Sequence, residues 1–296
     1  MTPAQQPIGV FDSGVGGLSV LRALQAALPH ERFVYLADSG HAPYGERGDV
    51  YVSARTRAIT QYLRTQHHIK ALVVACNTAT AAAIHEVRSD HPDLPLVGLE
   101  PAIKPALAVT RTGHVGVIGT RGTLTSRKFA KLLASLDGQA HFVVQPCDGL
   151  AHAIERSVAL PVPAMPGATE TAALCARYLQ AMGAFGTAPG QIDTLVLGCT
   201  HYIFVAHELR DLLGPDVQFI ETGEPVARQT RRLLETAGLL NLPDSQMHNS
   251  HGVATPQAAD APRIRLLTTG PVAMLQAAAQ RWLGLSASCC EAVSAP

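Results

Sequence analysis

The chain has 296 residues, of which 47% are hydrophobic, so it is long enough for one large domain or two ordinary ones with a substantial core. Lysine plus arginine and aspartate plus glutamate number 23 each, which gives a formal net charge of zero. This balance argues against a surface for nucleic acid or anionic lipid, and no stretch has the apolar length of a membrane-spanning helix.

The amino-terminal residues and the spacing of the cysteines indicate in which cellular compartment the protein is expected. Residues 1–7 are polar and contain no signal-peptide core. The six cysteines lack the spacing of a small disulfide scaffold, and no C-x-x-C pair indicates zinc. We therefore expect a protein of the reducing cytoplasm, with free thiols and without a metal site.

Strand-like and helix-like runs alternate through the first third of the chain. Strands are expected at 8–11, 33–37 and 71–75, and helices at 18–28, 50–66 and 79–88. The glycine-rich loop 12–17 follows the first strand, and the turn-rich loop 38–45 follows the second. Strands separated by helices of this length predict βαβ units and a parallel sheet.

A second start appears near the middle of the chain. The segment Gly116-Val117-Ile118-Gly119-Thr120 resembles Gly9-Val10-Phe11-Asp12-Ser13 in pattern, and a cysteine segment follows each. In this alignment Asp12 matches Gly119 and Ser13 matches Thr120. Such internal similarity favours an α/β fold of two pseudo-symmetric lobes, each a mostly parallel sheet flanked by helices, with the active site in the cleft between them.

The remaining elements divide the chain into lobes. Further strands are expected at 217–220 and 264–268, followed by helices at 225–237 and 271–283. We expect residues 1–99 plus 216–285 to form one discontinuous lobe and residues 100–215 to form the other. Residues 241–262 read as a mobile surface loop, and residues 286–296 as a disordered tail.

Two segments each place a cysteine at the carboxyl end of a buried strand. They are Val73–Ala79, V-V-A-C-N-T-A, and Val196–Tyr202, V-L-G-C-T-H-Y. Ligands bind at this edge of open α/β sheets. Cys76 and Cys199 would therefore put one thiol on each wall of a cleft. Racemisation or epimerisation needs such a pair, because an acid/base group must stand on each face of one carbon.

Structural roles remain open alternatives for each motif. Taken alone, Cys76 is more commonly a buried structural cysteine beside an Asn77-Thr78 helix cap. A helix amino terminus, however, also favours an acidic thiol and the binding of a carboxylate. Cys199 and His201 could also form a thiol hydrolase pair, or His201 could cap backbone groups. The loop after Asp12 could serve structure alone or bind an anion as well.

Four ordered motifs together resemble the glutamate racemases of the cofactor-independent Asp/Glu racemase superfamily, with similarity from Ile8 to about Leu283. The motifs are Phe11–Ser19, Asp38–Gly45, Ala75–Ala79 and Gly198–Tyr202. The sequence departs from the family at Ile203, where proline is usual, at Glu221-Thr222, where Asp-Ser is common, and in a longer 241–262 loop. None of these departures removes a presumed catalytic group.

The resemblance implies roles that the residues alone do not give. It implies that Cys76 and Cys199 are the catalytic pair, assisted by Asp12 near Cys76 and by Glu155 and His201 near Cys199. Taken alone, Glu155 reads as a solvated helix carboxylate and Tyr44 as part of a surface turn. The implied substrate-binding residues are Asp12, Ser13, Tyr44, Gly45, Asn77, Thr78, Thr200 and His201.

The expected function is the interconversion of L- and D-glutamate without a cofactor, which by resemblance supplies D-glutamate for peptidoglycan synthesis. No lysine lies in the motifs, so pyridoxal phosphate is not expected. Glutamate is the expected partner, without nucleic acid or membrane, and a homodimer is a candidate assembly. The alternatives are an aspartate or related amino-acid racemase, although aspartate racemases often carry a carboxylate in place of His201, and a non-catalytic ligand-binding protein of the same fold.

Overall fold

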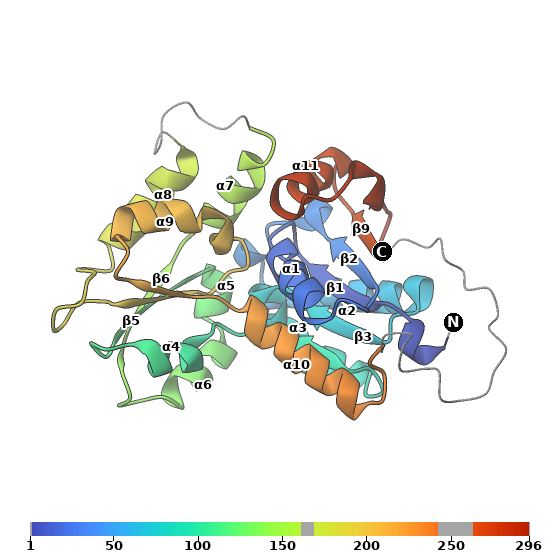
Figure 1. Ribbon diagram of the computed structural model, residues 1–296, viewed down its shortest axis with the longest axis horizontal. Helices are drawn as coiled ribbons and strands as arrows, with labels where there is room; N and C mark the ends of the chain where they lie inside the picture. Colours follow the sequence, from blue (N-terminus) through green and yellow to red (C-terminus); the bar gives the residue numbers. More distant parts are fainter. Residues whose placement is uncertain (1, 161–168, 242–262, 296) are drawn as a thin grey trace.

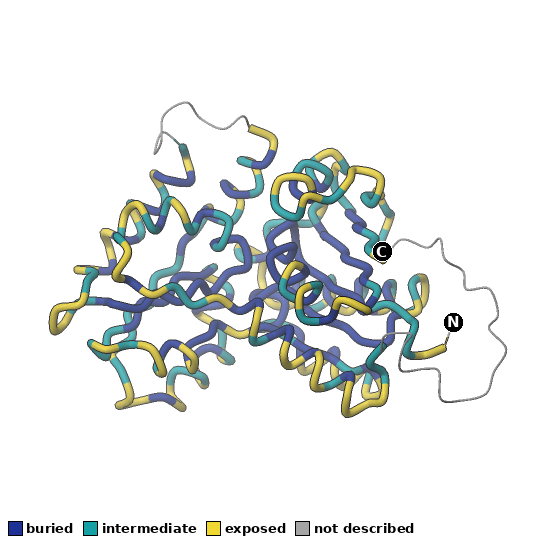
Figure 2. The backbone as a smooth tube through the Cα atoms, in the orientation of Figure 1, coloured by how far each residue is buried: buried dark blue, intermediate teal, exposed yellow. Residues whose placement is uncertain are grey.

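The computed structural model describes residues 2–160, 169–241 and 263–295, and within them the strands form two separate parallel sheets (Figure 1). Each sheet has helices on both faces and its own hydrophobic core. Figure 2 shows these cores as two buried regions, one per lobe. The predicted fold class, two α/β lobes, is confirmed.

The first sheet has the strand order β10-β9-β2-β1-β3-β4. Side chains alternate across it, so that Val10 faces one core and Phe11 the other. Helices α1 (Leu18–Ala27), α10 (Gly223–Thr236) and α11 (Val272–Leu283) cover one face, and α2 (Asp49–His67) and α3 (Asn77–Asp90) the other. The strands are β1 (Ile8–Asp12), β2 (Phe33–Ala37), β3 (Ala71–Val74), β4 (Leu96–Gly98), β9 (Ile264–Thr268) and β10 (Cys290–Ala292).

The second sheet has the order β6-β5-β7-β8, with strands β5 (His114–Gly119), β6 (His141–Pro146), β7 (Thr194–Leu197) and β8 (Gln218–Ile220). Helices α7 (Leu150–Ser157), α8 (Glu170–Gln180) and α9 (Ala206–Leu213) pack on one face, and α4 (Ile103–Val109) and α6 (Arg127–Ala134) on the other. The shorter helical segments are α5 (Arg121–Leu124), η1 (Pro3–Gln5), η2 (Ser39–His41), η3 (Tyr44–Glu46), η4 (Tyr202–Val205) and η6 (Ala287–Cys289).

The two sheets share one topology. The order β2-β1-β3-β4 in the first corresponds to β6-β5-β7-β8 in the second. The first strand of each half, β1 or β5, therefore lies beside the strand that precedes a motif cysteine, β3 or β7. Because all the pairings are parallel, the loops after β1 and β3 emerge at one edge of their sheet, and those after β5 and β7 at the corresponding edge of the other.

The expected lobe boundary at residue 216 is wrong for β8. This strand pairs with β7 in the second sheet, with Thr194 opposite Gln218. The chain returns to the first lobe only with α10, whose Val226, Ala227 and Leu234 pack in the core around α1. The internal repeat explains the placement, because β8 takes the position in the second sheet that β4 takes in the first.

The expected disorder of residues 286–296 is also wrong for the described part of that segment. Residues 290–292 form β10, which pairs with β9 so that Cys290 lies opposite Leu266. The Val293 N–H then donates to the Thr268 carbonyl over 2.8 Å. A short strand here satisfies the backbone groups of β9, which would otherwise form an open sheet edge. Most of the expected loop 241–262 lies outside the described residues.

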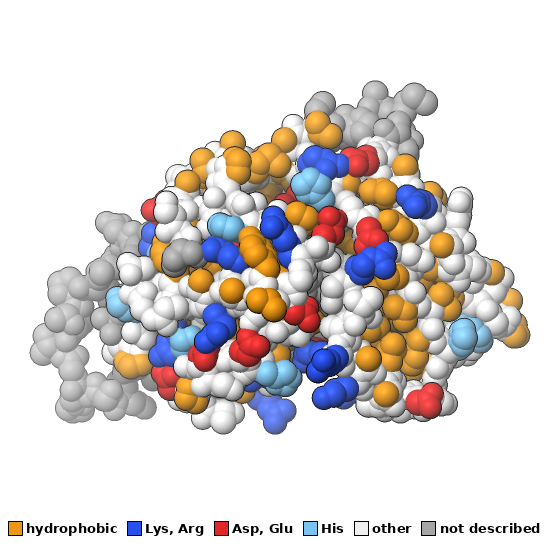
Figure 3. Space-filling view, turned by 180° about the vertical axis from the view of Figure 1, so that it is seen from behind, with side chains coloured by type: hydrophobic (Ala, Val, Ile, Leu, Met, Phe, Trp, Pro, Cys, Tyr) orange, Lys and Arg blue, Asp and Glu red, His pale blue; other side chains and the backbone are white. Residues whose placement is uncertain are grey.

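No helix in the described ranges is both long enough and apolar enough to cross a membrane. On the face drawn in Figure 3, Lys, Arg, Asp and Glu side chains are mixed along the middle of the molecule, with no large area of one sign.

Truncation of the chain after Leu285 should lower the free energy of unfolding by on the order of 1–3 kcal/mol, because it exposes the edge of β9 and removes side chains packed on both cores. Urea unfolding measures the change, and a chain ending at Val293, which keeps β10, serves as the control. Equal unfolding midpoints for the two truncated chains would show that β10 contributes nothing to stability.

Candidate active site

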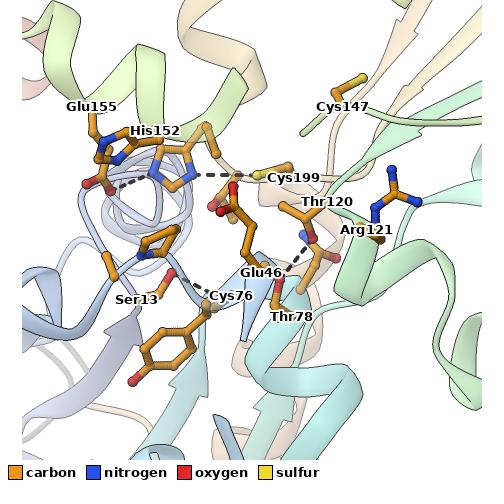
Figure 4. A pocket seen from close by; sticks show the side chains of 18 of the residues that line it. Ser13, Glu46, Cys76, Thr78, Thr120, Arg121, Cys147, His152, Glu155 and Cys199 are labelled. Carbon is orange, nitrogen blue, oxygen red and sulfur yellow. Dashed lines mark hydrogen bonds and ion pairs between the residues drawn. The ribbon is translucent and has the colours of Figure 1, made fainter. Parts of the chain in front are cut away.

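One cavity between the lobes is lined by both motif cysteines (Figure 4). Its volume is about 650 Å³, part of which is open to solvent. The structure brings every predicted site residue to this cavity, namely Asp12, Ser13, Tyr44, Gly45, Cys76, Asn77, Thr78, Glu155, Cys199, Thr200 and His201. Residues separated by more than a hundred positions thus meet because the carboxyl edges of the two sheets face one another.

Cys76 stands at the junction of β3 and α3. The helix begins at Asn77, two residues earlier than predicted, so Cys76 is its N-cap and its Sγ lies 3.4 Å from the Ala79 backbone nitrogen. The Ser13 hydroxyl lies 3.6 Å from the same sulfur. Burial and the nearby Asp12 carboxylate raise the pKa of the Cys76 thiol. The raised pKa therefore favours the protonated thiol.

Asp12 is fully buried and supports the Cys76 side of the cavity. Its carboxylate accepts hydrogen bonds from the backbone N–H groups of Ser13 and Gly17, and Ser13 Oγ lies 3.4 Å from Oδ1. A side chain at position 17 would put its Cβ 2.7 Å from Asp12 Cβ, so this close approach requires glycine. Burial raises the pKa of Asp12 to about 6, although the positive charge of His201 opposes the shift.

Cys199 is backed by a different pair of groups. Its Sγ lies 3.5 Å from Nδ1 of His201, and Nε2 of His201 lies 2.8 Å from Oε1 of Glu155. The same carboxylate oxygen accepts the Val15 N–H across the lobe boundary over 3.0 Å. Glu155 is therefore part of the site and not the solvated helix carboxylate that its sequence context alone indicates.

The two partners shift each other's proton affinity in opposite directions. Burial would raise the pKa of Glu155, but the hydrogen bond and charge of His201 outweigh it and lower that pKa. Burial would lower the pKa of His201, but Cys199 and Glu155 hold it well above its usual value. The arrangement therefore favours a carboxylate at Glu155 and an imidazolium at His201, next to the Cys199 sulfur.

Asn77 has no internal partner for its side chain. The residue is 4% exposed, yet neither its amide nitrogen nor its amide oxygen has a hydrogen-bond partner in the structure. Unpaired buried polar groups are costly, so such a pair of atoms on a cavity wall points to a bound polar ligand. Nearby, the Thr78 and Thr120 hydroxyls lie 2.9 Å apart across the lobe boundary.

Several cavity residues were not predicted from the sequence. Thr120 follows β5 as Ser13 follows β1, so the alignment of the two halves carried a signal for it. Arg121 and Asp148 form an ion pair at the cavity, and no sequence motif predicted this pair. Nothing in the sequence pattern singled out the other lining residues, which include Glu46, Cys147, Gly149 and His152.

Within residues 2–160, 169–241 and 263–295, no group of three or more His, Cys, Asp or Glu side chains is arranged to hold a metal ion.

A two-lobed α/β fold with a thiol from each lobe in one cavity is the architecture expected of a racemase. Residues 8–230 match the family model described as Asp/Glu/Hydantoin racemase. The chain belongs to this family and is a racemase.

Several relatives similar to this chain are named glutamate racemases. One from Ectopseudomonas mendocina is 50% identical over 240 residues, which cover 81% of this chain and 86% of the relative. Among solved structures, a glutamate racemase from Bacillus anthracis has 31% identity and a TM-score of 0.77, with 99% of each chain covered. The Escherichia coli enzyme, solved with L-glutamate and the activator UDP-MurNAc-ala, has 28% identity and a TM-score of 0.75, covering 93% of this chain and 95% of that one.

Glu155→Gln should return the pKa of His201 toward its ordinary value, because the neutral amide removes the charge that favours the imidazolium. A nitrogen–proton NMR titration should find that His201 loses its proton at a lower pH in the variant than in the wild type. Since the folded-state pKa is raised, the stability from this proton is present below about pH 6.5 and is lost as the pH rises through the folded value.

The matched control is Glu170→Gln, which removes an exposed carboxylate paired with Arg156 in the same lobe. It should leave the His201 titration unchanged. Equal His201 titration midpoints in the wild type and in Glu155→Gln would contradict the assignment.

Proposed function

We propose that this protein interconverts L- and D-glutamate without a cofactor, by a mechanism with two thiol bases. The observation that carries the proposal is the position of Cys76 and Cys199, one from each lobe, around a single cavity. Each sulfur has its own acid/base support, from Asp12 through Ser13 on one side and from Glu155 through His201 on the other. The glutamate racemases among its relatives support glutamate as the substrate.

In the proposed reaction, one cysteine as thiolate removes the α-proton from one face of the substrate. The other, as thiol, gives a proton to the opposite face, so the two sulfurs exchange protonation states in each turnover. Because the Cα–H of an amino acid is a very weak acid, most of the rate must come from positioning and from stabilising the carbanion-like transition state. A thiol serves both directions because its ordinary pKa is moderate.

The supporting groups differ between the two sides. On the Cys199 side, the raised pKa of His201 favours an imidazolium whose positive charge lies against the sulfur. On the Cys76 side, Asp12, with a pKa of about 6, exchanges a proton with the thiol through the Ser13 hydroxyl. Following the family resemblance, and not this electrostatic difference, we propose that Cys199 acts on L-glutamate and Cys76 on D-glutamate.

We propose that the polar groups around the thiols hold the substrate. Asn77 supplies an amide whose two polar atoms have no other partner, and Thr78, Thr200 and Ser13 supply hydroxyl groups on the same walls. Asn77 and Thr78 also lie in the first turn of α3, where the helix dipole and free N–H groups favour a carboxylate.

The proposed product is D-glutamate, a building block of peptidoglycan, and we propose that supplying it is the biological role. The chemistry needs both thiols reduced, which fits a reducing compartment such as the cytoplasm.

Purified protein mixed with L-glutamate and no added cofactor should lose the circular dichroism signal of the substrate until the two enantiomers are equal. Aspartate, which is one methylene shorter, should turn over at least about tenfold more slowly, because it cannot reach both walls of a cavity that holds the longer substrate. No loss of signal at high enzyme concentration would refute racemisation. Comparable rates with aspartate would refute the choice of substrate.

Cys76→Ser and Cys199→Ser should each reduce full racemisation by at least about a hundredfold, because each variant lacks one acid/base group. Each should still exchange the α-proton of one enantiomer for deuterium, since proton removal needs only the thiol on its own face. The Cys76 variant should keep exchange with L-glutamate, and the Cys199 variant with D-glutamate. Cys175→Ser, a buried cysteine away from the cavity, is the matched control and should racemise normally. Full activity in either site variant would exclude that cysteine as an obligatory acid/base group.

A further inference from the structure

We propose that Asp38 is a positioning residue of this site. It holds the cavity wall formed by residues 42–46, referred to here as the 42–46 wall, through the hydroxyl of Tyr44 and without contact to the substrate. The kinetic consequence rests on the proposed glutamate racemase function, whereas the anchoring of the wall does not.

Asp38 follows β2 directly and is fully buried. Both of its carboxylate oxygens are occupied by donors from the protein. Oδ2 accepts from the Tyr44 hydroxyl over 2.6 Å and from Arg55 Nε over 3.0 Å. Oδ1 accepts from Arg55 Nη2 over 2.8 Å, from His41 Nδ1 over 3.0 Å and from Thr269 Oγ1 over 2.8 Å. Asp38 is not among the cavity-lining residues, so these contacts are internal to the lobe.

The donors come from separate elements, which makes Asp38 a junction. Arg55 lies on α2, Thr269 follows β9, and Tyr44 lies in η3. The Asp38 N–H also donates to the carbonyl of Asp12 over 2.9 Å, which ties the junction to the strand that supports Cys76. A bidentate, charge-assisted pair with Arg55 fixes direction as well as distance, because the guanidinium presents its N–H groups in a planar fork.

Tyr44 transmits this fixed position to the cavity. The residue is 1% exposed, its ring packs against Phe11, and its hydroxyl donates to Asp38. The hydroxyl is therefore used inside the lobe and is not offered to a ligand. The wall also meets the other lobe, since a Cβ on Gly45 would lie 3.0 Å from Thr120 Cβ. A shift of this short segment would change the width of the cavity directly.

The chemistry of the site makes such a shift consequential. Residues 39–46 contain only two short 3₁₀ segments to hold their shape. A wall that contacts the substrate without carrying a reacting group contributes equally to ground-state and transition-state binding, so loosening it raises KM and leaves kcat. The 42–46 wall contains neither Cys76 nor Cys199, so loosening it should weaken the binding of both enantiomers equally. A cysteine substitution, in contrast, should affect the reactions of the two enantiomers differently.

The test compares Arg55→Lys and Tyr44→Phe with wild-type protein. Arg55→Lys keeps the charge and removes the fork, and Tyr44→Phe removes only a hydroxyl that faces Asp38. Both should raise KM for L- and D-glutamate by about tenfold, with kcat unchanged within about threefold. Asp38→Asn keeps the shape and removes the charge, and it should show the same pattern if it folds. Arg57→Lys is the matched control on the same helix, because Arg57 pairs with the partly exposed Asp90 away from the cavity, and it should change neither constant.

Amide hydrogen exchange supplies a readout that does not depend on activity. In Arg55→Lys, the amides of residues 40–47 should exchange faster than in wild type, while those of β1 and β3 stay protected. Unchanged exchange over 40–47 would overturn the anchoring role. Faster exchange with unchanged KM in both variants would overturn the positioning role. A wild-type protein that does not racemise glutamate would overturn the proposed function instead, and the exchange comparison would then decide alone whether Asp38 anchors the wall.

Discussion

One carboxylate oxygen joins the two lobes at the cavity that both motif cysteines line. Oε1 of Glu155, carried by the second lobe, accepts the N–H of Val15 from the first lobe and also contacts His201. The contact needs glycine on the facing loop, since a Cβ at Gly14 would lie 1.6 Å from that oxygen and a Cβ at Gly16 would lie 2.3 Å from His201 Nδ1. The glycine-rich loop is therefore required for the lobes to approach, and the approach places Cys199 in the same cavity as Cys76.

The two halves share a topology but support their thiols differently. Cys76 has a serine and a buried aspartate behind it, and Cys199 has a histidine and a glutamate. Burial raises the pKa of Asp12, whereas His201 lowers that of Glu155, so equivalent frames produce two distinct electrostatic environments. This difference is compatible with the proposed reaction on two mirror-image substrates, in which each thiol would meet its own face of the carbon.

Buried charge also shapes the rest of the cavity. Asp38 pairs with Arg55 and accepts a hydrogen bond from Tyr44, and Asn77 carries two buried polar atoms that have no hydrogen-bond partner in the structure. Both Asp38 carboxylate oxygens are paired within the protein, whereas the Asn77 amide atoms are not. In this site, completed polar networks hold the walls, and the incomplete one marks where a substrate would be recognised.

The sequence by itself determined the class of fold and the position of the two thiols. Short apolar runs alternating with helical periods give parallel strands, and the residue after such a strand falls at the ligand-binding edge, which placed Cys76 and Cys199 correctly around one cavity. The family resemblance added Glu155 and Tyr44, whose local patterns are those of a surface helix and a turn. The match of Thr120 to Ser13 in the internal repeat also indicated its position, but not a role for its side chain.

Only the tertiary structure decided which sheet β8 joins, that residues 290–292 form an edge strand, and that Asp38 meets Arg55 and Thr269. These features depend on pairing between segments far apart in the chain. A three-residue strand has too few side chains for its hydrophobic pattern to indicate which strand it pairs with. The pKa shifts of Asp12 and His201 belong to the same category, because burial and neighbouring charge arise only when the lobes close on one another.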